Sequence, residues 1–103
     1  MTTKPKNPKI PDLLATMTIR EFMVFLQHRR TLLHKPNNET REYARAINVL
    51  NIYVFGGKHT TVGDLIIDWD SFCVLPGAGK HTLKFIQSVL TELGAKDLPE
   101  INK

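Results

Sequence analysis

The sequence has one cysteine and no long apolar run, and each shortage excludes a class of protein. Cys73 is the only cysteine in 103 residues, so an internal disulfide is excluded, and its neighbours Phe72 and Val74 predict a buried thiol. No apolar stretch approaches the roughly 18 residues of a membrane helix, and the first residues lack the apolar region of a signal peptide. We therefore expect a cytoplasmic protein that does not enter a membrane.

Side chains that carry out catalysis or bind metal ions are also scarce. The histidines are scattered along the chain: His28, His34, His59 and His81. They are not accompanied by paired cysteines at zinc spacing. Asp64, Asp68 and Asp70 lie close together, but Asp64 and Asp70 stand where helix caps are expected, and no second catalytic set accompanies them. The sequence favours a protein that is not an enzyme and uses no cofactor or metal.

A turn with two glycines, within residues 75–82, joins two apolar segments. Gly77 and Gly79 bracket one small residue, which predicts a sharp turn through positive φ and an open approach to the backbone. An amphipathic helix is expected to begin after Gly79, so its free N–H groups and the positive end of its dipole would meet there. Three side chains would add charge and hydrogen bonds: Lys80, His81 and Thr82. This pattern predicts a phosphate site in the hairpin of a helix-hairpin-helix unit.

Two other interpretations of this turn stay open. A nucleotide-binding P-loop needs a glycine five residues before Gly79 and a serine or threonine after Lys80. Val74 and His81 occupy those two positions, which disfavours ATP or GTP binding. The second alternative is a simple connection between two helices.

Hydrophobic periodicity and capping patterns predict an all-α protein, a compact bundle of four to five helices. Thr18 and Glu21 form a capping box, and Gly94 is a suitable helix C-cap. The expected helices cover residues 19–33, 39–52, 62–67 and 80–93, with one further helical turn that begins at Asp70. No segment shows the alternation of a strand.

The composition of the two ends differs from that of the helical part. The net charge is +4, and most of the excess of basic residues falls within residues 1–35. Prolines and lysines recur over residues 4–11, a composition that buries too little apolar surface to hold one conformation. We expect a flexible basic arm over residues 1–16, one helical domain over residues 17–94, and a flexible tail over residues 95–103. The arm either contacts DNA phosphates or is simply solvated.

Three short motifs occur in the order in which one known helical domain has them. Residues 45–50 read Arg-Ala-Ile-Asn-Val-Leu, residues 61–65 read Thr-Val-Gly-Asp-Leu, and residues 76–83 read Pro-Gly-Ala-Gly-Lys-His-Thr-Leu. They are similar to the Arg-x-x-Asn-x-Leu helix, the Gly-Asp-Leu helix start and the Gly-Lys-Lys-Ser-Leu turn of the C-terminal domain of the bacterial RNA polymerase alpha subunit. Residues 41–94 thus resemble that domain, which contains a helix-hairpin-helix, and the helix within residues 17–35 is additional to it.

The resemblance implies that the chain binds double-stranded DNA and takes part in transcription regulation. In the family, the domain binds the minor groove of A·T-rich DNA. By resemblance, Arg45 would enter the minor groove, Asn48 would support it, and the glycine turn would hold phosphates. The implied DNA-binding residues are Arg45, Asn48, Gly77, Gly79, Lys80, His81 and Thr82. His81 replaces the usual second lysine of the family, which removes a charge.

The alternative function is a protein-interaction module that imitates the polymerase alpha domain. The family domain also contacts activators and sigma factor, so the partner would be sigma factor, another transcription factor or RNA polymerase itself. The additional helix within residues 17–35 offers the candidate surface, because two of its apolar residues fall outside the main stripe. The surface consists of Val24, Phe25, Arg29 and Arg30.

Overall fold

The computed structural model describes residues 8–33, 38–55 and 61–101. Six helices make up this described part: α1 (Asp12–Thr16), α2 (Ile19–Thr31), α3 (Asn38–Phe55), α4 (Val62–Ile67), α5 (Trp69–Cys73) and α6 (Lys80–Glu92). Extended pairing within it is limited to two isolated bridges, so the predicted all-α class is confirmed. Helix α1 is additional to the elements expected from the sequence.

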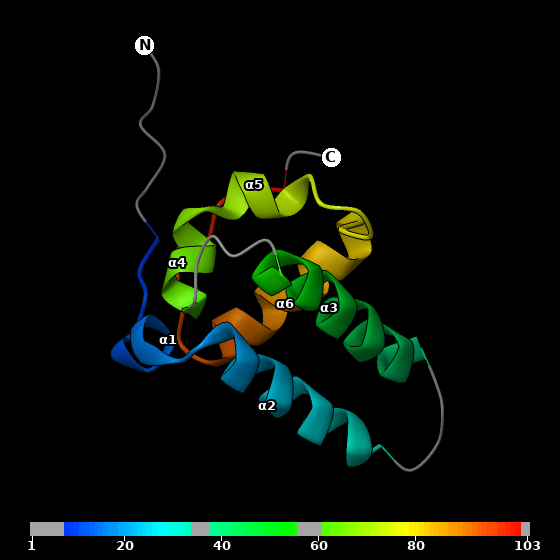
Figure 1. Ribbon diagram of the computed structural model, residues 1–103. Coiled ribbons are helices and arrows are strands. Elements are labelled where there is room, and N and C mark those ends of the chain that lie inside the picture. The colour runs from blue at the N-terminus through cyan, green and yellow to red at the C-terminus, as the bar shows by residue number, and fades with distance from the viewer. Residues whose placement is uncertain (1–7, 34–37, 56–60, 102–103) are drawn as a thin grey trace.

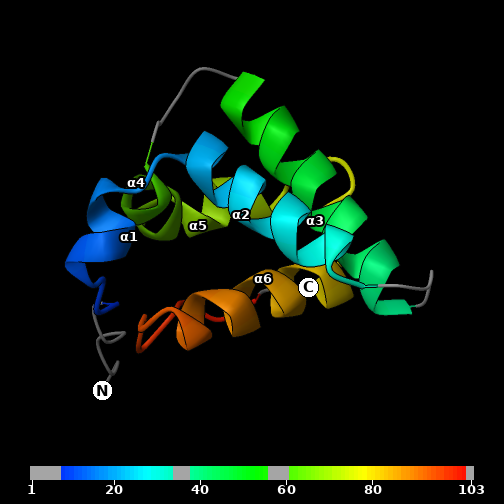
Figure 2. The same ribbon diagram turned by 90° about the horizontal axis from the view of Figure 1, so that it is seen from below.

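The three long helices form the frame of the molecule. Helix α3 packs against both α2 and α6, while α1 packs against α4 (Figure 1). Seen from below, α6 runs beneath the pair formed by α2 and α3 (Figure 2). The start of α6 therefore lies under α3, which is the geometry that creates the candidate site.

Local capping explains where several helices begin. The Thr18 N–H donates to Glu21 Oε1 and the Glu21 N–H donates to Thr18 Oγ1, both at 3.0 Å, so the predicted capping box of α2 is confirmed. At α4, Thr61 Oγ1 accepts from the Asp64 N–H at 3.1 Å. The expected cap at Asp70 is wrong, because Asp70 lies inside α5.

Helix α6 ends in a Schellman motif. Gly94 has φ 107°, the left-handed region that favours glycine. The Ala95 N–H donates to Leu90 O and the Gly94 N–H donates to Thr91 O, both at 3.0 Å. The predicted glycine C-cap is confirmed, and it turns the chain back toward the N-terminal segment.

One apolar core lies between the helices, and every helix contributes to it. Side chains that are fully buried come from α1 to α6: Leu14, Ile19, Phe22, Leu26, Leu50, Leu65, Ile66, Trp69, Phe72, Leu83, Ile86 and Leu90. Cys73 is buried as predicted. Because α2 supplies three of these side chains, it is part of the core and not an appendage.

The predicted flexible ends are wrong for residues 8–16 and 95–101. Lys9 and Lys96 exchange two backbone hydrogen bonds, of 2.8 and 3.0 Å, that join the two ends of the domain. Leu14 of α1 is fully buried, and Ala95 is buried just after α6. Residues 1–7 of the predicted arm and residues 102–103 of the predicted tail lie outside the described residues.

None of the described helices combines the length and the apolar composition that crossing a lipid bilayer requires.

Candidate functional site

The glycine turn positions the start of α6. The Ala78 N–H donates to Leu75 O at 3.0 Å and closes a four-residue turn with proline second and glycine third. Gly77 has φ 84°, which the third position of a type II turn requires. A Cβ atom at Gly77 would lie 3.5 Å from Val49 Cγ2, so this turn is also in contact with α3.

Gly79 differs from the prediction of positive φ. Its φ is −72° and its ψ is 162°, an extended conformation that any residue adopts. A Cβ atom at this position would meet nothing within 4 Å. The fold therefore does not need glycine at residue 79, and its effect is to leave the start of α6 uncovered.

The N-terminus of α6 has no side-chain cap. Gly79 offers no side chain to accept a hydrogen bond, and the first turn contains no acidic residue. The first backbone hydrogen bond of α6 runs from the Leu83 N–H to Gly79 O at 2.9 Å, so the amides of the preceding residues point out of the helix end. Lys80 places a positive charge at the positive end of the helix dipole, an unfavourable arrangement that a bound anion would offset.

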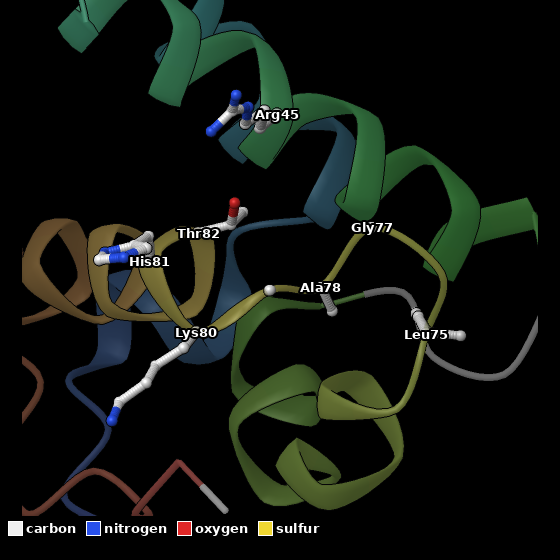
Figure 3. A pocket seen from close by; sticks show the side chains of 8 residues that line it. Arg45, Leu75, Gly77, Ala78, Lys80, His81 and Thr82 are labelled. Atoms are coloured by element: carbon white, nitrogen blue, oxygen red, sulfur yellow. The ribbon is translucent and has the colours of Figure 1, made fainter. Parts of the chain in front are cut away.

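An open pocket of about 470 Å³ joins this helix end to α3 (Figure 3). The lining residues come from α3, the turn and the first turn of α6: Arg45, Leu75, Gly77, Ala78, Gly79, Lys80, His81 and Thr82. Figure 3 shows the Thr82 hydroxyl pointing toward α3, with Arg45 lying above it. The Lys80 side chain extends away from Arg45, so Lys80 lines the pocket without aiming its ammonium group at the guanidinium.

Thr82 is the polar side chain buried most deeply in this pocket. Its residue is 4% exposed, and its hydroxyl makes no hydrogen bond with any residue in the described ranges. This hydroxyl is therefore available to donate a hydrogen bond into the pocket. A ligand oxygen in the pocket would satisfy it.

Six of the seven residues implied as DNA-binding thus lie together around one pocket. The seventh, Asn48, is exposed one turn beyond Arg45 on the same helix and does not line the pocket. The prediction did not include Leu75 or Ala78, which are apolar and complete the wall. It also did not include Glu42, although the spacing of three residues from Arg45 is a signal for an ion pair on a helix.

Glu42 and Arg45 form a loose ion pair at the edge of the site. Glu42 Oε1 lies 3.7 Å from Arg45 Nη1, and the side chains are 26% and 62% exposed, respectively. The other carboxylate oxygen, Glu42 Oε2, is buried and accepts no hydrogen bond from the described part of the chain. The guanidinium is therefore mostly in solvent, whereas the carboxylate is partly covered.

Two of the four residues of the second candidate surface, on α2, make contacts within the fold. Val24 is 68% exposed, but the Phe25 ring stacks on the Phe22 ring, with 6.3 Å between the ring centres. The Arg29 guanidinium lies 4.7 Å from the centre of the Phe25 ring and forms an ion pair with Glu92 of α6. That ion pair raises the pKa of Arg29 and lowers the pKa of Glu92. Of these contacts, the Arg29–Glu92 ion pair joins α2 to α6. Arg30, the fourth residue of this surface, is half-buried.

Comparison with known proteins gives no relative. No protein-family model, no curated protein and no solved structure matches this chain. The pocket beside α6 is the feature from which function is inferred. Its lining offers backbone amides, a hydroxyl and basic side chains and includes no acidic residue, which is the chemistry of an anion site.

Proposed function

We propose that this chain is a non-catalytic DNA-binding module. The observation that carries the proposal is the meeting of Arg45, from α3, with the uncapped N-terminus of α6 in one pocket. These two elements supply different parts of a DNA interface. The helix end binds phosphate, and the arginine reaches into an adjacent groove.

A phosphate of the DNA backbone would occupy the start of α6. Its oxygens would accept hydrogen bonds from the free amides of the first turn and from the Thr82 hydroxyl, which lacks another partner within the described residues. Lys80 and His81 flank this position, and Lys80 adds a positive charge. Such contacts fix the position of the protein on the duplex and make binding depend on salt, but they read little sequence.

Arg45 would supply the preference for A·T-rich DNA. Its side chain is 62% exposed and so is available to a partner. The narrow minor groove of A·T-rich DNA has an enhanced negative potential that attracts a guanidinium. Asn48, exposed one turn further along α3, would contact a base edge or a phosphate beside it.

The resemblance to the RNA polymerase alpha C-terminal domain supports the same proposal. Under it, α5, the glycine turn and α6 form the helix-hairpin-helix, and transcription regulation is the setting. The alternative, a module that binds sigma factor, an activator or RNA polymerase through α2, has less support. Phe25 and Arg29 of that surface already make contacts inside the molecule.

Replacing Arg45 with alanine tests the proposal. The variant should bind an A·T-rich duplex more weakly by about 1 to 3 kcal/mol, the usual contribution of one good side-chain contact in a groove. Arg45 is exposed and outside the core, so thermal unfolding should change little. Fluorescence anisotropy with a labelled duplex measures the effect. Equal affinities of the wild type and the variant would contradict this role for Arg45.

A further inference from the structure

Glu42 is an acidic residue directly beside the arginine on which the proposed DNA contact depends. It lies one turn before Arg45 on α3, and the two side chains approach to 3.7 Å. That distance is too long for a hydrogen bond, so the attraction is Coulombic and does not orient the guanidinium. The pair therefore does not act as a clamp that holds Arg45 ready for a ligand.

The two partners differ in their freedom to move. Arg45 is largely in solvent and can swing away, whereas the Glu42 side chain is 26% exposed and has one oxygen buried without a hydrogen-bond donor among the described residues. The carboxylate therefore keeps its position when the arginine leaves. Any phosphate or groove that takes Arg45 must therefore remove it from Glu42 and lose the attraction between the two side chains.

We propose that Glu42 is an internal competitor that limits the affinity of this site for DNA. The inference rests on the proposed function and adds its regulation: binding stays weak and readily reversible because each encounter must break the Glu42–Arg45 pair. Losing the Coulombic attraction of this exposed ion pair on binding should weaken binding about three- to tenfold at low salt. The effect should shrink as added salt screens the charges.

Glu42→Gln removes the charge and nearly keeps the shape, so it is the main test variant. It should bind an A·T-rich duplex about three- to tenfold more tightly at low salt. Its binding should also depend more steeply on salt, with the log–log slope larger by up to about 0.9, because one more cation becomes available to a phosphate. Asp12→Asn is the matched control, since Asp12 is exposed on α1 and does not line the pocket.

A double-mutant cycle separates a specific effect from a general change in net charge. If Glu42 acts through Arg45, then Glu42→Gln should give no gain beyond the Asp12→Asn control in an Arg45→Ala background. A gain of equal size with and without Arg45 would overturn the proposal. The proposal would also be overturned if the Glu42→Gln variant had the same affinity and salt slope as the Asp12→Asn control. If Glu42→Gln does not fold, which thermal unfolding reports, then Glu42→Ala serves, because it also removes the buried oxygen.

Failure of this inference is distinguishable from failure of the proposed function. If Arg45→Ala weakens DNA binding but Glu42→Gln behaves as the control does, the site stands and Glu42 is not a competitor. If the Arg45→Ala and Glu42→Gln variants both bind DNA as the wild type does, the DNA-binding role of Arg45 fails and the competition fails with it.

Discussion

Replacing Gly79 with aspartate should raise the stability of the protein and weaken its binding to DNA. Gly79 is the N-cap residue of α6, has an extended backbone and leaves open space where a Cβ atom would lie. An aspartate therefore fits without strain, and its carboxylate can accept hydrogen bonds from the first-turn amides. The same carboxylate then occupies the position that we assign to a DNA phosphate.

The magnitudes follow from the geometry of the helix end. Aspartate caps better than glycine by a few tenths of a kcal/mol, and its charge at the positive end of the dipole adds about 0.3 to 1 kcal/mol. A gain near 1 kcal/mol would raise the unfolding temperature by about 4 °C or slightly more for a domain of this size. DNA affinity should fall at least about tenfold, because the phosphate loses its donors and meets a negative charge.

The assay is a pair of measurements on the same samples: thermal unfolding by circular dichroism and anisotropy with an A·T-rich duplex. Opposite changes in the two would exclude misfolding as the cause of weak binding. Gly79→Ala is the control, since it adds a Cβ atom without a charge or a cap and should reduce affinity less. If Gly79→Asp is more stable and binds DNA as the wild type does, then the start of α6 is not a phosphate site.

Two further predictions concern stability. Leu14→Ala should destabilise the protein by about 2 to 4 kcal/mol, because Leu14 is fully buried and its truncation leaves a cavity in the core. Leu14 lies in the segment that the sequence predicted to be flexible. Urea unfolding measures the change, and a loss below about 0.5 kcal/mol would show that α1 is not part of the core. Burial and the hydrogen bond to Asp68 raise the pKa of Tyr53, so the folded state holds the phenol proton more tightly than the unfolded state. That stabilisation is complete below the ordinary tyrosine pKa near 10 and is lost as pH rises above it. Tyr53→Phe should therefore lose stability less steeply above pH 10 than the wild type, and parallel alkaline unfolding curves would contradict this.

The sequence predicted those features that depend on neighbouring residues. The capping box of Thr18 and Glu21 and the C-cap at Gly94 are local patterns, and both occur in the structure. The pairing of Lys9 with Lys96 joins segments at opposite ends of the chain, so no local pattern indicates it, and the proline-rich composition pointed the other way. For the same reason, the pairing of Arg29 with Glu92 could not be read from α2 alone.

The candidate site was likewise predicted from the sequence only in part. The resemblance to a known domain suggested that Arg45 and the glycine turn belong together, and the pocket contains both. The sequence did not distinguish the roles of the two glycines. Gly77 needs positive φ because it is third in a turn after Pro76, whereas Gly79 takes an ordinary extended conformation. The approach of Glu42 to Arg45 depends on side-chain rotamers and burial, which spacing alone does not define.

A titration of ¹⁵N-labelled protein with A·T-rich and G·C-rich duplexes tests the central claim most directly, because it maps the surface and the sequence preference together. We predict that DNA shifts the NMR resonances of the amides of residues 79–83 and of the side chains of Arg45 and Asn48. These shifts should occur at lower concentrations of the A·T-rich duplex than of the G·C-rich duplex. Spectra that do not change at these positions, or changes confined to α2, would contradict the assignment of the pocket between α3 and α6 as a DNA interface.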